Sequence, residues 1–281
     1  MGLANFTKTY IASTIIMALK KVLVAGSVAN QEYTGQITDI NGEVDIIQLP
    51  NVTISGYTKG SGLNAQTIND AVTKLKADQA YYFDIKLYDV EGNDLKQRIM
   101  TALSDNAAYG FRDTSDQYLL GLYAQAGLTS YYTGTTPWDV TSLNVEDVLL
   151  DVKEQMARVP QAGRYAIIPE WFHGKLLTAG ILAKTSNDNL FDNGLITRAY
   201  GFDWYLSENV SASNTSTWDQ TRILFGQKGV SMAYCDAIVK TETARVEADF
   251  ADLIKGIHVF GGKVTRPDTL CCAYCDKTAE S

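Results

Sequence analysis

Histidine and cysteine are scarce in this 281-residue sequence, which has two histidines and four cysteines. A structural zinc site needs four ligands, usually two Cys-x-x-Cys pairs or one such pair with two histidines. Cys272 and Cys275 form one pair in "TLCCAYCD", but the only cysteine outside this stretch is Cys235, and His173 and His258 are widely separated. We therefore expect neither a metal site nor another cofactor. We interpret the stretch as a reduced, partly buried strand, and a role for Cys271, Cys272 and Cys275 in disulfides between subunits remains a hypothesis.

Runs of basic residues are also missing, since the longest is Lys20-Lys21 and the net charge is -8. A free-standing nucleic-acid-binding domain usually carries a basic patch that replaces the counterions around phosphates. The sequence argues against that class. Its 46% hydrophobic and 20% charged residues are ordinary for a globular protein and exclude a wholly disordered chain.

No apolar run is long enough to cross a membrane, which takes about 20 residues. The best candidate, residues 10–19, follows a single lysine and ends at Lys20 and Lys21. This pattern does not fit a secretory signal. We expect a soluble protein made in the cytoplasm, where disulfide bonds are rare.

Motifs of common enzyme classes are missing too. Glu170 and His173 are the best pair for acid–base or metal chemistry, but no second histidine stands at HExxH spacing, and there is no G-x-S-x-G elbow. The Gly-rich tip at 60–62 lacks the Gly-Lys-Ser/Thr ending of a phosphate-binding loop, and the stretch 261–265 lacks the upstream glycine at the right spacing. His258 alternates with apolar neighbours, which indicates a strand-surface or core residue. We predict no catalytic residues, with a hydrolase using Glu170 and His173 as an alternative.

The N-terminal part of the sequence contains apolar residues without an obvious cover. Spacings of three and four between Phe6 and Leu23 predict a helix with one apolar face within residues 1–33. This helix either folds on its own core or docks on another subunit.

Residues 34–66 predict a long β-excursion, because they are rich in β-branched residues, glycine and asparagine. Strands are expected at 44–49 and 52–57, with an Asn-Gly hairpin turn at 41–42 and a flexible tip at 60–62. Few large apolar residues lie on one side, so the excursion is not expected to pack fully on its own domain.

Two long elements follow. Residues 73–87 alternate between apolar and charged positions, which predicts a single half-buried strand. Residues 94–126 change to helical spacing, and a helix of roughly 30 residues would be about 45 Å long at ~1.5 Å per residue. Gly110 weakens this helix without breaking it.

A second module begins at Asn144, the expected N-cap of a helix that runs to Arg158. Asp147 at the third helical position and a hydrophobic staple between Leu143 and Val148 complete the capping pattern. A proline–glycine turn, a short buried strand at 165–168 and a helix starting after Pro169 follow. Further strands are predicted at 200–206, 221–234, 237–247 and 253–266.

In this order, the elements resemble the major capsid protein of tailed bacteriophages, with its Hong Kong 97-type fold. The resemblance covers nearly the whole chain and is carried by the order of elements together with local stretches. These stretches are "DQAYYFDIKLYDVEGNDL" (78–95), "VPQAGRYAIIPEWFHGKLL" (159–177), "NGLITRAYGFDWYLSENV" (193–210) and "HVFGGKVTRPDTL" (258–270).

The resemblance implies an α+β fold divided into the parts of that family. These are an N-terminal arm (1–33), an E-loop (34–66), a peripheral domain (67–135 and 229–270) with a spine helix at about 94–126, an axial domain (136–228) and a C-terminal tail (271–281). The E-loop would lie across a neighbouring subunit, and the arm would reach another neighbour.

The resemblance also implies a function: self-assembly into hexamers and pentamers of an icosahedral shell around double-stranded DNA. The expected partners are other copies of the chain, a scaffolding protein, a portal protein and the packaged DNA; no charged coiled-coil segment precedes the arm, so the scaffold is expected to be separate. Assembly would take place in the host cytoplasm and the product would be the virion capsid. An encapsulin-like compartment is the alternative with the same fold.

Candidate subunit contacts follow from the same division. They are Phe6, Tyr10, Ile15, Leu49, Val52, Tyr57, Lys59, Arg164 and Trp171. Arg164 has three open interpretations: bonds to nearby carbonyls, a pair with an acid of another subunit, or an exposed position at the start of a strand. Lys59 is the lysine of the E-loop, but no partners for an isopeptide crosslink can be identified, so none is assigned.

Overall fold

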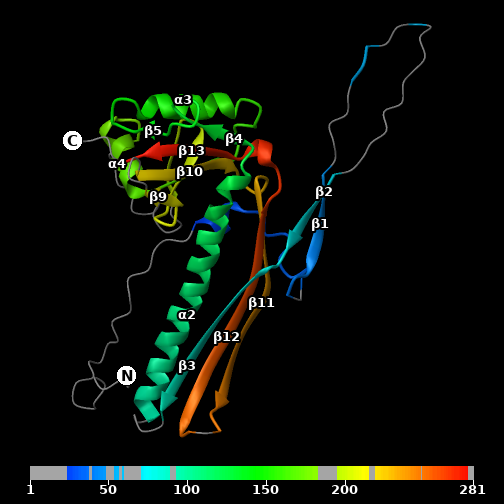
Figure 1. The fold of residues 1–281 in the computed structure, drawn as a ribbon, viewed down its shortest axis with the longest axis vertical. Helices are drawn as coiled ribbons and strands as arrows, with labels where there is room; N and C mark the ends of the chain where they lie inside the picture. Colours follow the sequence, from blue (N-terminus) through cyan, green and yellow to red (C-terminus); the bar gives the residue numbers. More distant parts are fainter. Residues whose placement is uncertain are drawn as a thin grey trace.

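Two parts can be told apart in the fold: a long, narrow sheet beside one long helix, and a rounder part built on a larger sheet (Figure 1). The computed structural model describes residues 24–37, 40–48, 54–56, 59, 71–88, 93–182, 195–214, 219–247 and 249–277. Both termini lie outside these residues.

The long helix α2 spans Asn93–Gly121 and confirms the helix predicted at 94–126. Its 29 residues make it about 44 Å long at ~1.5 Å per residue, and the chain then tightens into a 3-10 helix at Leu122–Gln125. It lies along an antiparallel sheet in the order β11 (Met232–Arg245), β12 (Ala251–Val264), β3 (Gln79–Tyr88). Aromatic and aliphatic side chains of β3 face the helix; Phe83, for example, contacts Phe111 at 5.5 Å between ring centroids.

The single strand predicted at 73–87 is wrong, because the structure has two strands, β2 (Ala71–Lys76) and β3, with a break between them. The amide of Ala77 donates to the carbonyl of Gly42, and the amide of Asn41 donates to the carbonyl of Ala77. These bonds direct the chain from one sheet into the other. Two residues separate the strands, so the alternation of apolar positions continues through the break.

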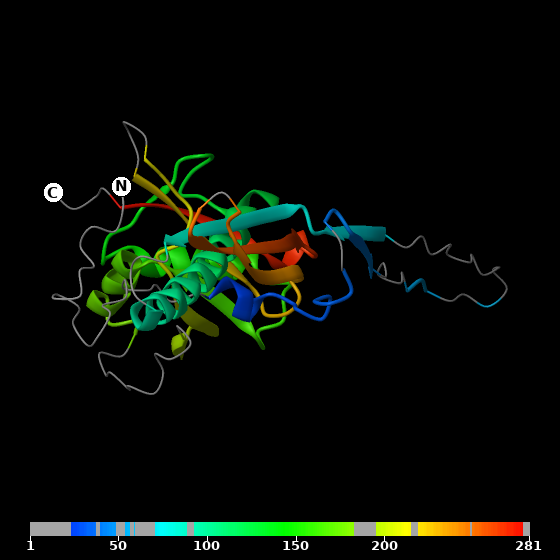
Figure 2. The same ribbon diagram turned by 90° about the horizontal axis from the view of Figure 1, so that it is seen from below.

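Strand β2 pairs with β1 (Glu43–Gln48), which matches the strand expected at 44–49. The second expected strand, 52–57, is described only at 54–56, which are not in a strand. The β1–β2 ribbon projects to one side of the body (Figure 2). A turn is present at Asn41, which has φ 63°, but it precedes β1 and joins no two strands of the described residues, so the predicted hairpin turn is wrong.

The larger sheet has the order β4-β13-β10-β6-β8-β7, with β5 paired to β13 and β9 to β10. Its strands are β4 (Leu128–Ser130), β5 (Trp138–Asp139), β6 (Arg164–Ile168), β7 (Leu195–Ala199), β8 (Phe202–Leu206), β9 (Ala212–Asn214), β10 (Asp219–Gln227) and β13 (Cys271–Asp276). Helices α3 (Val145–Gln155) and α4 (Glu170–Thr178) close one core against it. The end of α2 and the short helix α1 (Ala25–Val28) close a second core, which includes residues of β6, β10 and β13.

Helix α3, strand β6 and helix α4 are present as predicted for the second module, but α3 ends at Gln155 instead of Arg158, and its N-cap side chain makes no hydrogen bond to the helix. Asn144 is the N-cap of α3, β6 is fully buried, and Pro169 precedes α4. Leu143, however, is 93% exposed and so does not pack on Val148. The Asn144 side chain accepts from the amide of Thr141 and donates to a carbonyl of the preceding loop, so it orders the entry to the helix instead.

The later strands are present, but several predicted boundaries are wrong. Strand β11 runs from Met232 to Arg245 without the break that was predicted between residues 234 and 237. The strand predicted at 221–234 runs through a turn in which Gly229 has φ 70°, so β10 ends at Gln227 and β11 begins at Met232. The strand predicted at 200–206 begins at Phe202, because Tyr200 and Gly201 both have positive φ and form the turn after β7. Of the helices in the described residues, none combines the length and apolarity needed to cross a membrane.

Candidate assembly surfaces

The β1–β2 ribbon has one covered face and one bare face. On the covered face, Leu75 and Ile46 pack against Val259 and other residues of the long sheet. On the bare face, Ile47 and Val72 are direct cross-strand partners with 63% and 48% of their surface exposed. An apolar cross-strand pair without a cover is typical of a contact surface.

The long sheet also has an exposed region, formed by neighbouring residues of β3, β12 and β11. A shallow groove there is lined by Tyr82, Phe83, Asp84, Lys240, Glu242, Lys255, Gly256 and Ile257. Tyr82 is 80% exposed, and Glu242 pairs with Lys240 and, at 3.5 Å, with Lys255. At the far end of the sheet Phe250 is 77% exposed. Sequence reasoning missed this surface because a charged, alternating strand is also the pattern of a strand facing water.

The predicted contact residues are only partly placed. Six of them lie outside the described residues: Phe6, Tyr10, Ile15, Leu49, Val52 and Tyr57. Lys59 is in an exposed turn, and Trp171 is partly buried with its ring against Phe172 at 5.6 Å.

Arg164 is 4% exposed and binds backbone carbonyls, which was one of its three interpretations. It donates to the carbonyl of Met156 at 2.7 Å, to that of Pro160 at 3.2 Å and to that of Val159. These carbonyls follow α3, where the helix dipole favours a cation. The arginine is therefore used inside the subunit and not at a contact between subunits.

The pair Glu170 and His173 lies on the first turn of α4. The carboxylate oxygen is 3.7 Å from Nδ1 of the histidine, and Glu170 is 65% exposed. The Glu208 carboxylate accepts a hydrogen bond from the backbone amide of Glu170 at 2.8 Å, so Glu208 caps the start of the helix. Among the described residues no group of three or more His, Cys, Asp or Glu side chains could hold a metal ion.

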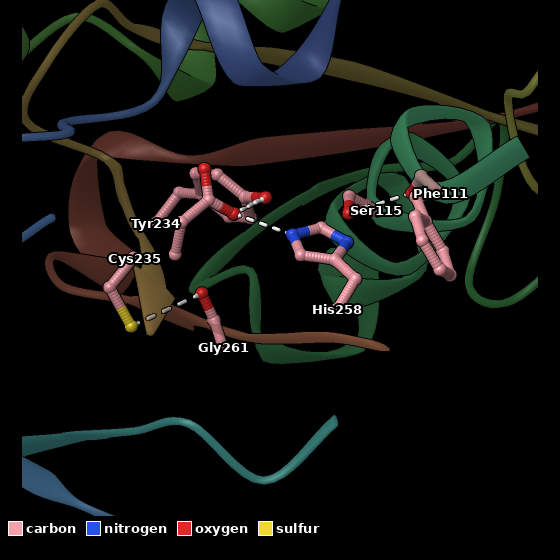
Figure 3. A network of polar contacts seen from close by, with 7 residues as sticks. Phe111, Ser115, Tyr234, Cys235, His258 and Gly261 are labelled. Carbon is pink, nitrogen blue, oxygen red and sulfur yellow. Dashed lines mark hydrogen bonds and ion pairs between the residues drawn. The ribbon is translucent and has the colours of Figure 1, made fainter. Parts of the chain in front are cut away.

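The other histidine, His258, is a core residue on β12, 5% exposed, as one of its two interpretations proposed (Figure 3). The centroid of its ring lies 5.4 Å from that of Phe111 of α2 and 4.9 Å from that of Phe260. Its Nε2 is 2.8 Å from a carboxylate oxygen of Asp236, which also accepts a hydrogen bond from the Tyr234 hydroxyl. The contact between His258 and Asp236 lies where the pairing of β11 with β12 shifts its register, between Asp236 and Ile238.

This cluster predicts a specific loss of stability in acid. Burial alone would raise the pKa of Asp236, but the bonds from His258 and Tyr234 lower it overall. A lowered folded pKa contributes stability above the unfolded value of about 3.9, which is lost as the pH falls through the folded pKa. Because the carboxyl is about a third exposed, we expect His258→Phe to cost only about 1 kcal/mol at pH 7.

Urea unfolding of the wild type and of the His258→Phe variant at pH 7 and pH 3 measures this loss. The difference should shrink at pH 3, and Asp236→Asn should remove it at both values. If His258→Phe lowered the free energy of unfolding equally at pH 7 and pH 3 in the protein that keeps Asp236, the effect would come from ring packing alone.

A second polar cluster joins α2 to two distant segments. The carboxylate of Asp116, 3% exposed, accepts from the amides of Val24 and Ala25 at 2.9 and 2.6 Å. Its other oxygen accepts from Ser207 at 3.4 Å and Asn209 at 3.1 Å. Asp116 therefore fixes the start of α1 and the loop after β8 to the long helix.

The four cysteines are free and fully buried. On β13, Cys271 and Cys275 face one core and Cys272 faces the other, because side chains alternate along a strand. The Cys-x-x-Cys pair therefore cannot chelate one ion. The hypothesis of disulfides between subunits is wrong for this fold, because no thiol reaches the surface.

We predict that these thiols react with Ellman's reagent only after unfolding. Burial raises the pKa of Cys235 to about 11 and that of Cys272 to about 12, and it also raises the pKa values of Cys271 and Cys275. The thiolate is the reactive form. At pH 8 no thiol should react within minutes in buffer, and four should react in 6 M guanidinium. Rapid reaction of one thiol in buffer would show that its strand opens.

Comparisons with known proteins agree with this architecture. A sequence model of the phage capsid protein family matches residues 71–273. A solved chain of Mycobacterium phage Che8 is 22% identical, with a TM-score of 0.73 over 96% of this chain and 97% of that one. The capsid of cyanophage P-SCSP1u is 16% identical, with a TM-score of 0.69 over 96% and 93%. The capsid of an empty GTA particle is 12% identical, with a TM-score of 0.65 over 97% and 96%. No curated protein sequence matches the chain.

At such low identities the structural likeness shows the fold, and it confirms the predicted Hong Kong 97-type capsid fold of the α+β class. The match of the family model to most of the chain shows the family. The chain belongs to the phage capsid protein family and is a structural protein of the virion capsid.

Proposed function

We propose that this protein is the major subunit of an icosahedral shell that encloses double-stranded phage DNA, and that its copies assemble as hexamers and pentamers. The observation that carries the proposal is the set of uncovered apolar side chains on a member of the capsid family. Ile47 and Val72 on the ribbon, Tyr82 on the long sheet and Phe250 at its end are all exposed. Side chains of this kind are buried when subunits associate.

We assign the parts of the chain as its family resemblance implies. Residues 1–33 are the N-terminal arm, 34–66 the E-loop, 67–135 with 229–270 the peripheral domain, 136–228 the axial domain and 271–281 the tail. The ribbon supports this division, because β1 lies within residues 34–66 and the outer face that it shares with β2 exposes Ile47 and Val72 among the described residues. Leu49, Val52, Tyr57 and Lys59 would then contact the neighbour that the E-loop crosses.

The contacts of the other parts are assigned in the same way. Phe6, Tyr10 and Ile15 would be contacts of the arm, and Trp171 a contact of the axial domain. We also infer a separate scaffolding protein, a portal protein and assembly in the host cytoplasm. The net charge of -8 suits a shell that encloses DNA without holding it.

Negative-stain electron microscopy of the purified protein, with and without co-expressed phage proteins, tests the proposal. Closed shells, or rings of five and six subunits, are expected. A monodisperse monomer under every condition would contradict it. Shells that load a bacterial cargo protein and need no portal would favour the encapsulin-like alternative.

The hydrolase alternative has its own control. The double variant Glu170→Ala, His173→Ala should assemble as the wild type does. Loss of a defined hydrolytic turnover in a folded double variant would support an enzyme instead.

A further inference from the structure

The guanidinium group of Arg222 on β10 makes only long hydrogen bonds to the side chains that the structure describes. Its guanidinium reaches Ser211 Oγ and Gln220 Oε1 only at 3.5 and 3.4 Å, at the outer limit of a hydrogen bond. Its Nε is buried and has no partner among the described residues. The guanidinium carbon lies 4.7 Å from the centroid of the Tyr123 ring, which supplies a cation–π contact.

The surroundings of Arg222 are aromatic and half-buried. Tyr274 is its direct partner on β13, and the Tyr274 ring stacks on Tyr131 with centroids 4.2 Å apart. Arg222 and the three tyrosines are all intermediate in exposure. Tyr123 and Tyr274 pack against the core that α1 and the end of α2 close. We name Arg222, Tyr123, Tyr131 and Tyr274 the arginine–tyrosine patch.

No carboxylate of the described residues pairs with Arg222. The acid in the same row of side chains, Asp276, is 3% exposed and accepts from the Asp219 amide at 2.9 Å. A half-buried guanidinium without an anion loses hydration and gains little in return. In a chain with 32 acidic and 24 basic residues, a partner acid is readily supplied by another copy.

We propose that the arginine–tyrosine patch is a contact that receives a carboxylate from a second copy of this chain. Arginine and tyrosine are the residues enriched where interface binding energy concentrates. The planar guanidinium binds a carboxylate through two parallel N–H···O bonds, which suits one acidic side chain. A phosphate backbone would instead favour a stripe of several cations, whereas the side chains that contact Arg222, namely Ser211, Gln220 and Tyr123, are neutral. The proposal rests on the proposed function, since it needs copies that assemble.

The test compares Arg222→Gln with Arg222→Lys and with Arg158→Gln, which removes an exposed arginine from the turn after α3. The concentration at which shells form is measured by light scattering at several salt concentrations, and thermal unfolding of the unassembled subunit is measured in parallel. We expect Arg222→Gln to raise that concentration at least tenfold and to reduce its salt dependence. The lysine variant should lie between, and Arg158→Gln should match the wild type.

A charge exchange identifies the source of the carboxylate. Arg222→Glu should abolish assembly, and one Asp→Lys or Glu→Lys substitution at an exposed position should restore it. Assembly of Arg222→Gln at the wild-type concentration and salt dependence would overturn the proposal. So would a fall in subunit unfolding temperature that accounts for the assembly defect, or normal shells that fail only to retain DNA. If the wild type forms no shells, the proposed function itself fails.

Discussion

Replacing Asp116 by alanine should lower the free energy of unfolding by about 3 kcal/mol. The variant leaves the amides of Val24 and Ala25 without the carboxylate oxygen that they share in the native protein, whereas the side-chain amide of Asn209 keeps its 2.7 Å bond to Asp113. Each buried donor without a partner costs about 1–3 kcal/mol, and the loss of a buried charge offsets part of that sum.

The matched control is Asp116→Asn, which keeps one oxygen for the two backbone amides and should lose about 1 kcal/mol or less. Urea unfolding of the unassembled subunit measures both variants. Hydrogen exchange should locate the effect, because the amides of Val24 and Ala25 should exchange about a hundredfold faster in the alanine variant than in the wild type. Equal stability of Asp116→Ala and the wild type would mean that water replaces the carboxylate at no cost.

The same pair of proteins has a defined pH dependence. Burial raises the pKa of Asp116, although the hydrogen bonds from Ala25, Asn209, Val24 and Ser207 oppose the shift. With the folded pKa above the unfolded value of about 3.9, the contribution is fully present below that value and is lost as the pH rises through the folded pKa. The wild type should therefore gain stability relative to Asp116→Asn as the pH falls from 7 towards 4.

The parts of the fold that the sequence predicts well are those whose signals are local. The long apolar periodicity of residues 94–126 predicts α2, and the residues around Pro169 predict β6 and α4 in order. The order of elements then supports the capsid fold more strongly than any one motif does.

The errors arise where distant segments decide. The alternation at 73–87 cannot reveal the break at Ala77, because that break depends on bonds to the turn at Asn41 and Gly42. Leu143 satisfies the spacing of a staple, yet the loop before α3 is ordered through the Asn144 side chain and leaves the leucine in water.

The functional residues divide in the same way. Asp116 stands in the helix as an ordinary polar position, and only the return of the chain at Val24 and Asn209 makes it a buried acceptor. Arg222 likewise stands in a strand pattern that gives no sign of an unpaired guanidinium. Arg222 stands directly before the apolar residues Ile223, Leu224 and Phe225 of β10, and this position does not identify a partner.

Gly261→Ala should lower the free energy of unfolding as much as Asp116→Ala does, because the added methyl group would clash with backbone atoms. A Cβ at this position of β12 would lie 2.0 Å from the carbonyl oxygen of Lys76 and 2.9 Å from Cα of Ala77. Ala77 cannot retreat freely, because its amide and carbonyl are bonded to Gly42 and Asn41. We expect a loss of about 3 kcal/mol, at the upper end for overpacking.

Two other glycines separate this clash from a general effect of adding a methyl group. A Cβ at Gly262 would meet Leu119 Cδ2 at 2.7 Å, and that side chain can rotate, so Gly262→Ala should cost about 1 kcal/mol. A Cβ at Gly110 in α2 meets nothing within 4 Å, and Gly110→Ala should add up to about 1 kcal/mol of stability. Urea unfolding should therefore find Gly110→Ala the most stable of the three variants, Gly262→Ala the next and Gly261→Ala the least stable. The clash would push the end of β2 away from β12, on which the ribbon packs, so Gly261→Ala should weaken shell assembly beyond its effect on folding. A variant that assembles normally would show that the placement of the ribbon is not required.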